Sequence, residues 1–486
     1  MKLSTLLVLL PGCALAYDLL NVALYAKDPN HLYNIVRDNS DIDYGCRPTI
    51  LRSRHEHKLH AFVSRGQLDR LKRSLEPGVV RVDMLENLNK RQANGAPIGR
   101  GDRFQGGQVA PRGLGSRNPG EAVDLGGIMN VDEVYSALKG LENTYGIETF
   151  TAPQRTYEGR TILGGVANKA KIGKDKQYIY LTSGIHARER GGPDSLIYFI
   201  SDLLYANEHR TGLTYGNKTY SNSQVQRALE AGIVFIPLTN PDGVRHDQQN
   251  GNNWRKNRNP ASSTPGNDRS VGVDLNRNFD FLWNYTRYFD PSSGVATSND
   301  PTSDQFYGTS SFSEPETQAI AWVYTQYPKI RWFVDIHSYG GTMLYSWGDD
   351  NNQSNDPNQN LFNEAFDGRR GVLEDSVYRE FIDETDSRNV ALQASKTSAA
   401  IRAVGGRSYV PKQAANLYAT SGSSDDYAFS RWHKDRSVNK VYGFTMEFGV
   451  QSHFYPTSEE FTHNIVDTSA GFMEFVLTAS EIGLTD

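Results

Sequence analysis

The sequence predicts an α/β protein in which a mixed, mostly parallel, twisted sheet is sandwiched by helices, with a small α+β segment in front. Helix-like and strand-like hydrophobic patterns alternate from residue 129 onward, which is typical of this class. Several predicted strands are continuous apolar runs, as expected for strands buried on both faces. The chain of 486 residues, 38% of them hydrophobic, is long enough to bury a large core.

The composition excludes several classes of partner. The net charge of −5 provides no general basic field for nucleic acid. The mean hydropathy is −0.57, and no apolar run after residue 16 approaches the roughly 18 residues needed to span a bilayer. We therefore expect the protein to bind neither nucleic acid nor membrane. We also expect it to be a monomer.

The first sixteen residues have the order of a secretory signal. Lys2 precedes an apolar run at residues 6–10, and small residues lead up to Ala16. We expect residues 1–16 to be removed and the protein to be secreted and extracellular. A bacterial lipoprotein site at Cys13 is the alternative, which Pro11 fits poorly. Three N-x-S/T sequons fit a secreted glycoprotein; they begin at Asn217, Asn284 and Asn352.

A basic segment precedes an acidic body. Between residues 47 and 118 there are fifteen Lys or Arg against six Asp or Glu. Hydrophobic patterns predict a strand at 59–63, a helix at 67–75 and a strand at 79–84, so we expect residues 17–93 to form a small α+β unit. Opposite charges favour docking of this unit on the body, although a disordered basic arm is the other interpretation.

A glycine-rich stretch follows that unit. Residues 94–127 contain ten glycines and almost no apolar periodicity. We expect a flexible linker over residues 94–124 that a trypsin-like protease could cut. The candidate cleavage points are Arg100, Arg103, Arg112 and Arg117.

The body, residues 125–480, alternates between helix and strand patterns. The spacing of apolar residues predicts helices at 131–145, 194–206 and 313–327, and strands at 177–182, 232–238, 330–336 and 441–446. Ser313 is predicted to cap the third helix, with Pro315 in its first turn.

Three of these strands run directly into polar groups. One leads to His186 and Glu189, the next to His337, and the last to Glu447. Ligands bind beyond strand ends in open α/β sheets. Two His and one Glu make a zinc set that leaves the fourth position open to water, as in catalytic sites. Each His is unremarkable alone, and a structural role is its more frequent use.

Polar loops lie between these strands. They contain Arg255, Asn276 and Arg277 in segments that resemble neither a helix face nor a strand face. A guanidinium pairs with a carboxylate through two hydrogen bonds, so these loops suggest recognition of an anion. From spacing alone, a solvated loop is an equal alternative.

Taken together, the motifs resemble the carboxypeptidase A/B family of zinc metallocarboxypeptidases, over about residues 125–480. The match is closest to secreted microbial or fungal members, since no cysteine follows Cys46. The front segment resembles the inhibitory propeptide of the family. The matching motifs are Tyr157-Glu158-Gly159-Arg160, Gly184-Ile185-His186-Ala187-Arg188-Glu189, Asn240-Pro241-Asp242-Gly243, Trp254-Arg255-Lys256, Asp274-Leu275-Asn276-Arg277-Asn278, Ile336-His337-Ser338-Tyr339, Leu417-Tyr418-Ala419-Thr420-Ser421-Gly422 and the strand that ends at Glu447.

The resemblance implies one zinc ion and a role for each matching residue. It makes His186, Glu189 and His337 the zinc ligands, and Glu447 the general base. Arg255 would stabilise the oxyanion. The substrate-binding residues would be Asn276, Arg277 and Tyr418 around the terminal carboxylate, and Arg188 and Tyr339 for residues upstream of the cut. The implied activity is removal of the C-terminal residue from peptides. The resemblance also implies that the enzyme is made as a zymogen, which another protease activates.

The resemblance also indicates a side-chain preference. Ungapped counting puts Asp425 at the floor of the side-chain pocket, where Asp accompanies C-terminal Lys or Arg, and Gly348 would leave the pocket roomy. Gln413, placed on the pocket wall, fits neither standard pocket. A one-residue shift would make Asp425 an external residue, so a broad or apolar preference is the alternative.

Two other hypotheses assign the chain to different classes of function. The chain could be a zinc-binding relative without peptidase activity, which the presence of Glu447, Arg255 and Arg277 opposes. It could act on modified peptides such as peptidoglycan stems or polyglutamate, and Asp425 opposes an acidic substrate. Calcium sites around Asp300 and Asp349 are conceivable, although solvated loops are the expected state of these segments.

Overall fold

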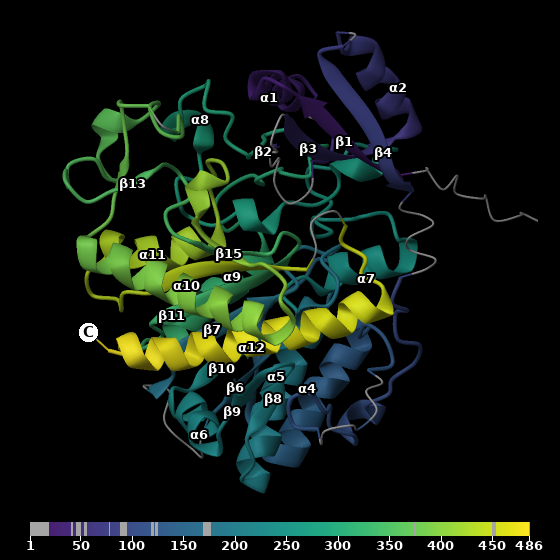
Figure 1. The fold of residues 1–486 in the computed structure, drawn as a ribbon, viewed down its shortest axis with the longest axis vertical. Helices are drawn as coiled ribbons and strands as arrows, with labels where there is room; N and C mark the ends of the chain where they lie inside the picture. Colours follow the sequence, from purple (N-terminus) through teal and green to yellow (C-terminus); the bar gives the residue numbers. More distant parts are fainter. Residues whose placement is uncertain are drawn as a thin grey trace, which may run out of the picture.

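The computed structural model describes most of the chain (Figure 1). Its described residues are 19–39, 42–44, 50–52, 56–76, 78–87, 95–117, 121, 125–168, 176–373, 375–449 and 453–485. The expected signal at 1–16 lies outside these residues, as do Cys13 and Cys46.

An eight-stranded mixed sheet forms the centre of the body. The four central strands are parallel, and antiparallel neighbours flank them on both sides. This confirms the predicted carboxypeptidase-like sheet. In spatial order the strands are β15 (Val410–Gln413), β12 (Thr342–Tyr345), β16 (Tyr442–Phe448), β11 (Trp332–Ser338), β7 (Ile179–Ser183), β10 (Ile233–Ile236), β6 (Thr161–Ala167) and β5 (Glu148–Arg155).

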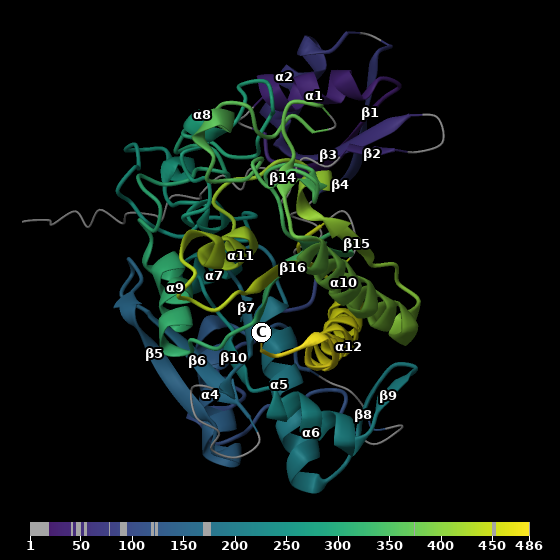
Figure 2. The same cartoon turned by 90° about the vertical axis from the view of Figure 1, so that its left-hand side faces the viewer.

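Helices cover both faces of the sheet, as the view along its edge shows (Figure 2). One face packs in a large core against α4 (Val131–Tyr145), α5 (Gly192–His209), α6 (Asn222–Glu230), α10 (Glu384–Gly405) and α12 (Ser458–Ile482). The other face packs in a second core against α9 (Pro315–Gln326) and α11 (Ser424–Lys434). None of the described helices combines the length and apolar character required to cross a membrane.

Shorter elements complete the body. The described ones are α7 (Pro241–Asn250), α8 (Tyr285–Tyr288), the hairpin of β8 (Leu213–Tyr215) and β9 (Lys218–Tyr220), and the pair of β13 (Asn352–Gln353) and β14 (Glu380–Phe381).

Burial and capping explain why the strongest predicted elements form. Every residue of β7, β11 and β16 is buried, which accounts for their continuous apolar character. Helix α4 begins after Asn130, which accepts from the backbone of Glu133, and ends at Gly146 in a left-handed conformation. The predicted cap of α9 is wrong, because the cap position is Glu314 and the Ser313 hydroxyl bonds to the Glu314 carboxylate.

The front segment forms its own small sheet at the top of the molecule (Figure 1). Its order is β2 (Ile50–Arg52), β3 (His57–Ser64), β1 (Leu19–Ala26) and β4 (Val80–Asn87), all antiparallel. Helices α1 (Pro29–Asp38) and α2 (Arg65–Ser74) pack on it around a separate core. The described residues between 19 and 87 thus form an α+β unit, with two strands and one helix more than the sequence predicted.

Residues 95–117 differ from the flexible linker that their glycines suggested. The Gly99 N–H donates to the Ile128 carbonyl at 2.8 Å. The Arg103 guanidinium donates to the Glu133 carboxylate of α4 at 2.8 and 3.1 Å. Further on, the backbone of Gly115 donates to the buried carboxylate of Asp202 in α5 at 2.8 Å. A Cβ at Gly113 would collide with that same carboxylate, so glycine is required for close approach. We call residues 95–117 the strap.

Candidate functional site

The three strands that were expected to deliver polar groups are neighbours in the sheet. Strand β11 lies between β7 and β16, and all three are parallel. Ile336 pairs with Ser183 and His337 pairs with Glu447, so the carboxyl ends of the strands meet at one edge. His186 and Glu189 follow β7 directly, in the turn that precedes α5. The structure therefore brings together four residues that are up to 261 positions apart in the chain.

His186, Glu189 and His337 converge on one point. The Glu189 carboxylate lies 2.7 Å from His186 Nδ1 and 3.1 Å from His337 Nδ1, and the two Nδ1 atoms are 3.1 Å apart. All three side chains are buried, and among the described residues they are the one group of three that could hold a metal ion. Two facing imidazole nitrogens and a carboxylate are a donor set that suits zinc. The residues present therefore fit a single Zn²⁺.

Two further carboxylates orient the imidazole rings. Asp274 Oδ1 lies 3.1 Å from His186 Nε2, and Asp335 Oδ2 lies 3.1 Å from His337 Nε2. Such outer partners fix ring orientation and raise the basicity of a metal-binding imidazole. We did not predict these roles from the sequence, although Asp274 lies in a matching motif. Asp335 had a detectable signal, since it is two residues before His337 and shares its strand face.

Arg255 lies directly beside the ligand set. Its Nη1 atom is 3.2 Å from His186 Nδ1, and Asp274 Oδ2 holds its Nε and Nη2 atoms at 3.0 and 2.9 Å. Burial opposes ionisation of Asp274, but the charge of Arg255 and the hydrogen bond of His186 hold the pKa of Asp274 well below its usual range. A permanently charged guanidinium is thus fixed beside the metal-binding group.

Asn276 and Arg277 lie in a one-turn segment after Asp274, close to the loop that carries Tyr418. The Asn276 Oδ1 atom accepts from the backbone of Ser424 at 2.8 Å. Arg277 is fully buried and donates to the carbonyls of Ala296 and Asn276. Tyr418 is half-buried. The two polar residues predicted for anion recognition therefore adjoin the segment 418–425.

Asp425 lies in the first turn of α11, where it is buried rather than external. Its carboxylate accepts from Thr445 Oγ1 at 2.9 Å and from the Asp426 backbone at 3.0 Å. Thr445 is two residues before Glu447, so both side chains lie on one face of β16. The Asp425 carboxylate thus lies on the catalytic side of the sheet.

A second acid, Asp426, faces Gly348. The Gly348 backbone donates to the Asp426 carboxylate at 3.1 and 3.2 Å, and a Cβ at this glycine would come within 2.5 Å of Asp426 Oδ2. Gln413 has a structural role in the turn around Gly348. Its side-chain amide donates to the carbonyls of Trp347 and Asp350 and so fixes that turn. Its poor fit to a substrate pocket follows from that role.

The front segment contacts the two residues expected to line the upstream approach. Asp43 holds both terminal nitrogens of Arg188, at 2.5 and 3.2 Å, and accepts from Asn253 Nδ2 at 3.0 Å. Phe62 packs edge-on against Tyr339, with ring centroids 6.5 Å apart. The α+β unit therefore covers this part of the site.

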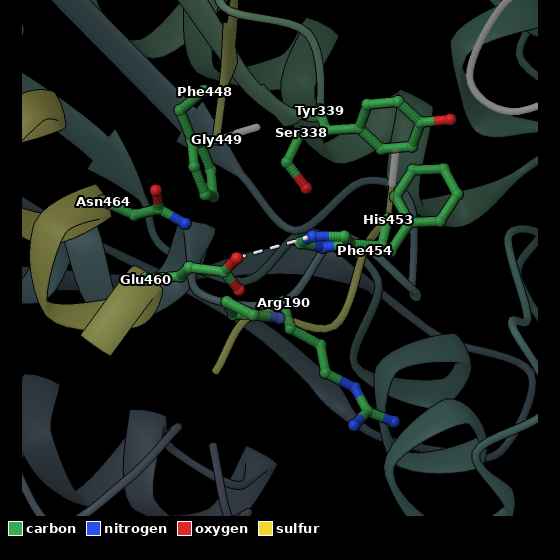
Figure 3. Close-up of a pocket in the computed structure, with 10 residues that line it drawn as sticks. Arg190, Ser338, Tyr339, Phe448, Gly449, His453, Phe454, Glu460 and Asn464 are labelled. Atoms are coloured by element: carbon green, nitrogen blue, oxygen red, sulfur yellow. Dashed lines mark ion pairs between the residues drawn. The ribbon is translucent and has the colours of Figure 1, made fainter. Parts of the chain in front are cut away.

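A small pocket lies just beyond the ends of β11 and β16 (Figure 3). Ser338, Tyr339 and Gly449 line it on the side of the metal ligands, and an ion pair between His453 and Glu460, 3.6 Å long, lines the other side. This pocket adjoins the site but contains none of the metal ligands.

Comparisons with known proteins agree with this geometry. A family model described as zinc carboxypeptidase matches residues 134–471. Carboxypeptidase B of Helicoverpa zea is 31% identical over 182 residues, 37% of each chain, and carboxypeptidase O of Bos taurus is 30% identical over 56% of this chain and 60% of its own. The chain thus spans between about a third and two thirds of the length of the curated relatives it matches.

Solved structures show the same fold. Carboxypeptidase A from Helicoverpa armigera aligns with a TM-score of 0.68 at 18% identity, over 96% of this chain and 98% of its own. Thrombin activatable fibrinolysis inhibitor aligns with a TM-score of 0.62 at 18% identity, over the same shares. With the family model covering well over half of the chain, and the His-Glu-His site formed where three parallel strands end, this chain belongs to the zinc carboxypeptidase family.

Proposed function

We propose that the chain is a zinc-dependent exopeptidase that removes the C-terminal residue of peptides and proteins. The observation that carries this proposal is the position of Glu447 and Arg255 around the metal-binding group. Glu447 is paired in register with the ligand His337, and Arg255 lies 3.2 Å from the ligand His186. A base and a fixed cation beside a metal site are what peptide hydrolysis needs.

Each residue then has a defined task. Zinc, when bound, supplies a Lewis acid. Glu447 takes a proton from the attacking water as its oxygen bonds to the scissile carbonyl carbon, and delivers that proton to the leaving amine as the C–N bond breaks. Arg255 donates to the developing oxyanion. Asn276 and Arg277 bind the terminal carboxylate, with Tyr418 above it, which restricts cleavage to chain ends.

A preference for C-terminal Lys or Arg is the second part of the proposal. Its support is the burial of Asp425 on the catalytic side of the sheet, where its described partners are Thr445 Oγ1 and the Asp426 backbone. A buried carboxylate without a cationic partner is costly, so a basic substrate side chain would be favoured.

The third part is synthesis as a secreted, inactive precursor. The front segment places Asp43 on Arg188 and Phe62 on Tyr339, which supports a propeptide at 17–93 that blocks upstream subsites until an activating protease cuts. The signal-like residues 1–16 support export.

One experiment tests the proposed activity. The full chain is cut by limited proteolysis and incubated with blocked dipeptides ending in Arg, Phe or Glu, with and without a chelator. We expect release of the terminal residue, fastest from Arg, that the chelator abolishes and added Zn²⁺ restores. The variant Glu447→Gln should retain zinc but lose at least about 10³-fold in kcat. Absence of any chelator-sensitive release would refute the proposed activity.

A further inference from the structure

Two carboxylates meet the same guanidinium nitrogen at Arg188. Asp43 of the front segment lies 2.5 Å from Arg188 Nη1, and Asp304 of the body lies 3.1 Å from that same atom. The Arg188 side chain is completely buried, whereas that of Asp304 is 25% exposed. No sequence motif points to Asp304.

The loop that carries Asp304 is fixed to the site. The Lys256 ammonium donates to the Pro301 carbonyl at 2.6 Å, and the Asp274 backbone donates to the Phe306 carbonyl at 2.8 Å. Both anchors are neighbours of metal-site residues, so Asp304 is held in position on either side. Burial opposes its ionisation, but the charges of Arg188, Arg269 and Lys256 lower the pKa of Asp304.

The two acids therefore compete for one cation. Two carboxylates on one nitrogen repel each other, which weakens the hold of Asp43 on the site. When the front segment leaves, Arg188 keeps one carboxylate partner, because Asp304 remains. Resting on the proposed precursor function, we propose that Asp304 is a positioning residue for Arg188 that weakens autoinhibition by Asp43 and holds Arg188 in place in the active enzyme.

The test compares the uncut full chain with the same protein after activation. The measured quantity is a ratio: the rate of hydrolysis of a small blocked dipeptide before cutting, divided by the rate after cutting. Effects of a substitution on folding and on the chemical step cancel in this ratio. We expect Asp304→Asn to lower this ratio by about fivefold, because Asp43 then has Arg188 to itself. In an Asp43→Asn background the same substitution should leave the ratio unchanged. A merely structural role for Asp304 would loosen the front segment and raise the ratio.

Asp300→Asn is the matched control, since Asp300 is exposed in the same loop and its carboxylate accepts hydrogen bonds from the backbone and the hydroxyl of the nearby Thr302. A readout that does not need activity is retention of the cut front segment during gel filtration in rising salt. Asp304→Asn should retain it to higher salt than the unmodified chain and than Asp300→Asn. An unchanged or raised ratio, or earlier release, would overturn the proposal; absence of hydrolysis by every activated protein would instead refute the proposed function.

Discussion

Asp425 is the residue on which the proposed substrate preference depends. Replacing it with Ile removes the buried carboxylate and adds apolar volume. We expect Asp425→Ile to reduce kcat/KM for peptides ending in Lys or Arg by about 10²-fold and to raise it for Leu or Phe. Asp435→Asn, at the exposed end of the same helix, is the control. If cleavage of C-terminal Lys is unchanged and Leu and Phe are no better, Asp425 does not form the pocket floor.

Asp335 is expected to act on zinc through His337. Asp335→Asn removes the charge that faces His337 Nε2, so the affinity for zinc should fall by about 10- to 100-fold. Competition with a chelator measures this directly. Thr182→Val removes a hydrogen bond to the other oxygen of Asp335 and should leave zinc affinity nearly unchanged. Equal losses in both variants would indicate a general effect on stability.

The three sequons differ in their surroundings. Asn217 and Asn284 are exposed, whereas the Asn352 amide is occupied: it donates to the Ser346 carbonyl and accepts from Gln413 Nε2 at 3.0 Å. We expect the protein to carry at most two glycans when it is exported from a glycosylating eukaryotic host. Mass measurement before and after endoglycosidase treatment counts them. A third glycan that disappears in Asn352→Gln would contradict this expectation.

At the scale of the element, the strap belongs to the catalytic domain. Arg103 is bonded to Glu133, and Arg112 and Arg117 both pair with Glu121, so three of the four candidate cleavage points lie in packed backbone. Arg100 alone among them is exposed. We therefore expect the activated enzyme to begin at or before Gly101, as N-terminal sequencing would show. A mature chain beginning after Arg112 or Arg117 would contradict this.

Hydrophobic periodicity and capping signals predicted an element well where residues close in sequence determine its ends. Helix α4 has the predicted bounds, because Asn130 caps it and Gly146 ends it. The glycines of the strap were misread, since Gly113 is required for close approach to α5 and Gly115 for close approach to Tyr215 of β8, and both approaches are tertiary contacts. For the same reason Asp274 and Asp304 were missed as partners of His186 and Arg188: each acts across more than eighty residues.

At the scale of the whole molecule, several acids are buried in the body. Burial is the main cause that raises the pKa of each, to about 7 for Asp194, Asp350 and Glu380 and to about 8 for Glu316. A folded pKa above the unfolded value of about 4 means that the folded state binds more protons. This contribution to stability is complete below about pH 4 and is lost as pH rises through about 7 to 8.

We therefore expect the midpoint of thermal unfolding to be higher at about pH 5 than at about pH 8. The free energy of unfolding should likewise be larger at about pH 5 than at about pH 8. Glu380→Gln should reduce that difference in free energy by on the order of 2 kcal/mol. Glu364→Gln is the control, since that side chain is 82% exposed. A midpoint that rises between the two pH values would show that the buried acids do not dominate.

The first turn of α11 ties the side-chain pocket to the metal-binding group. Ser424 Oγ donates to Asp335 at 2.7 Å, and Asp335 faces His337, while the next residue is Asp425. We therefore expect a change in the proposed pocket to reach the metal-binding group through these three consecutive links. An engineer who reshapes the pocket of this protein should expect zinc occupancy to change with it, and should measure metal content before interpreting any altered preference.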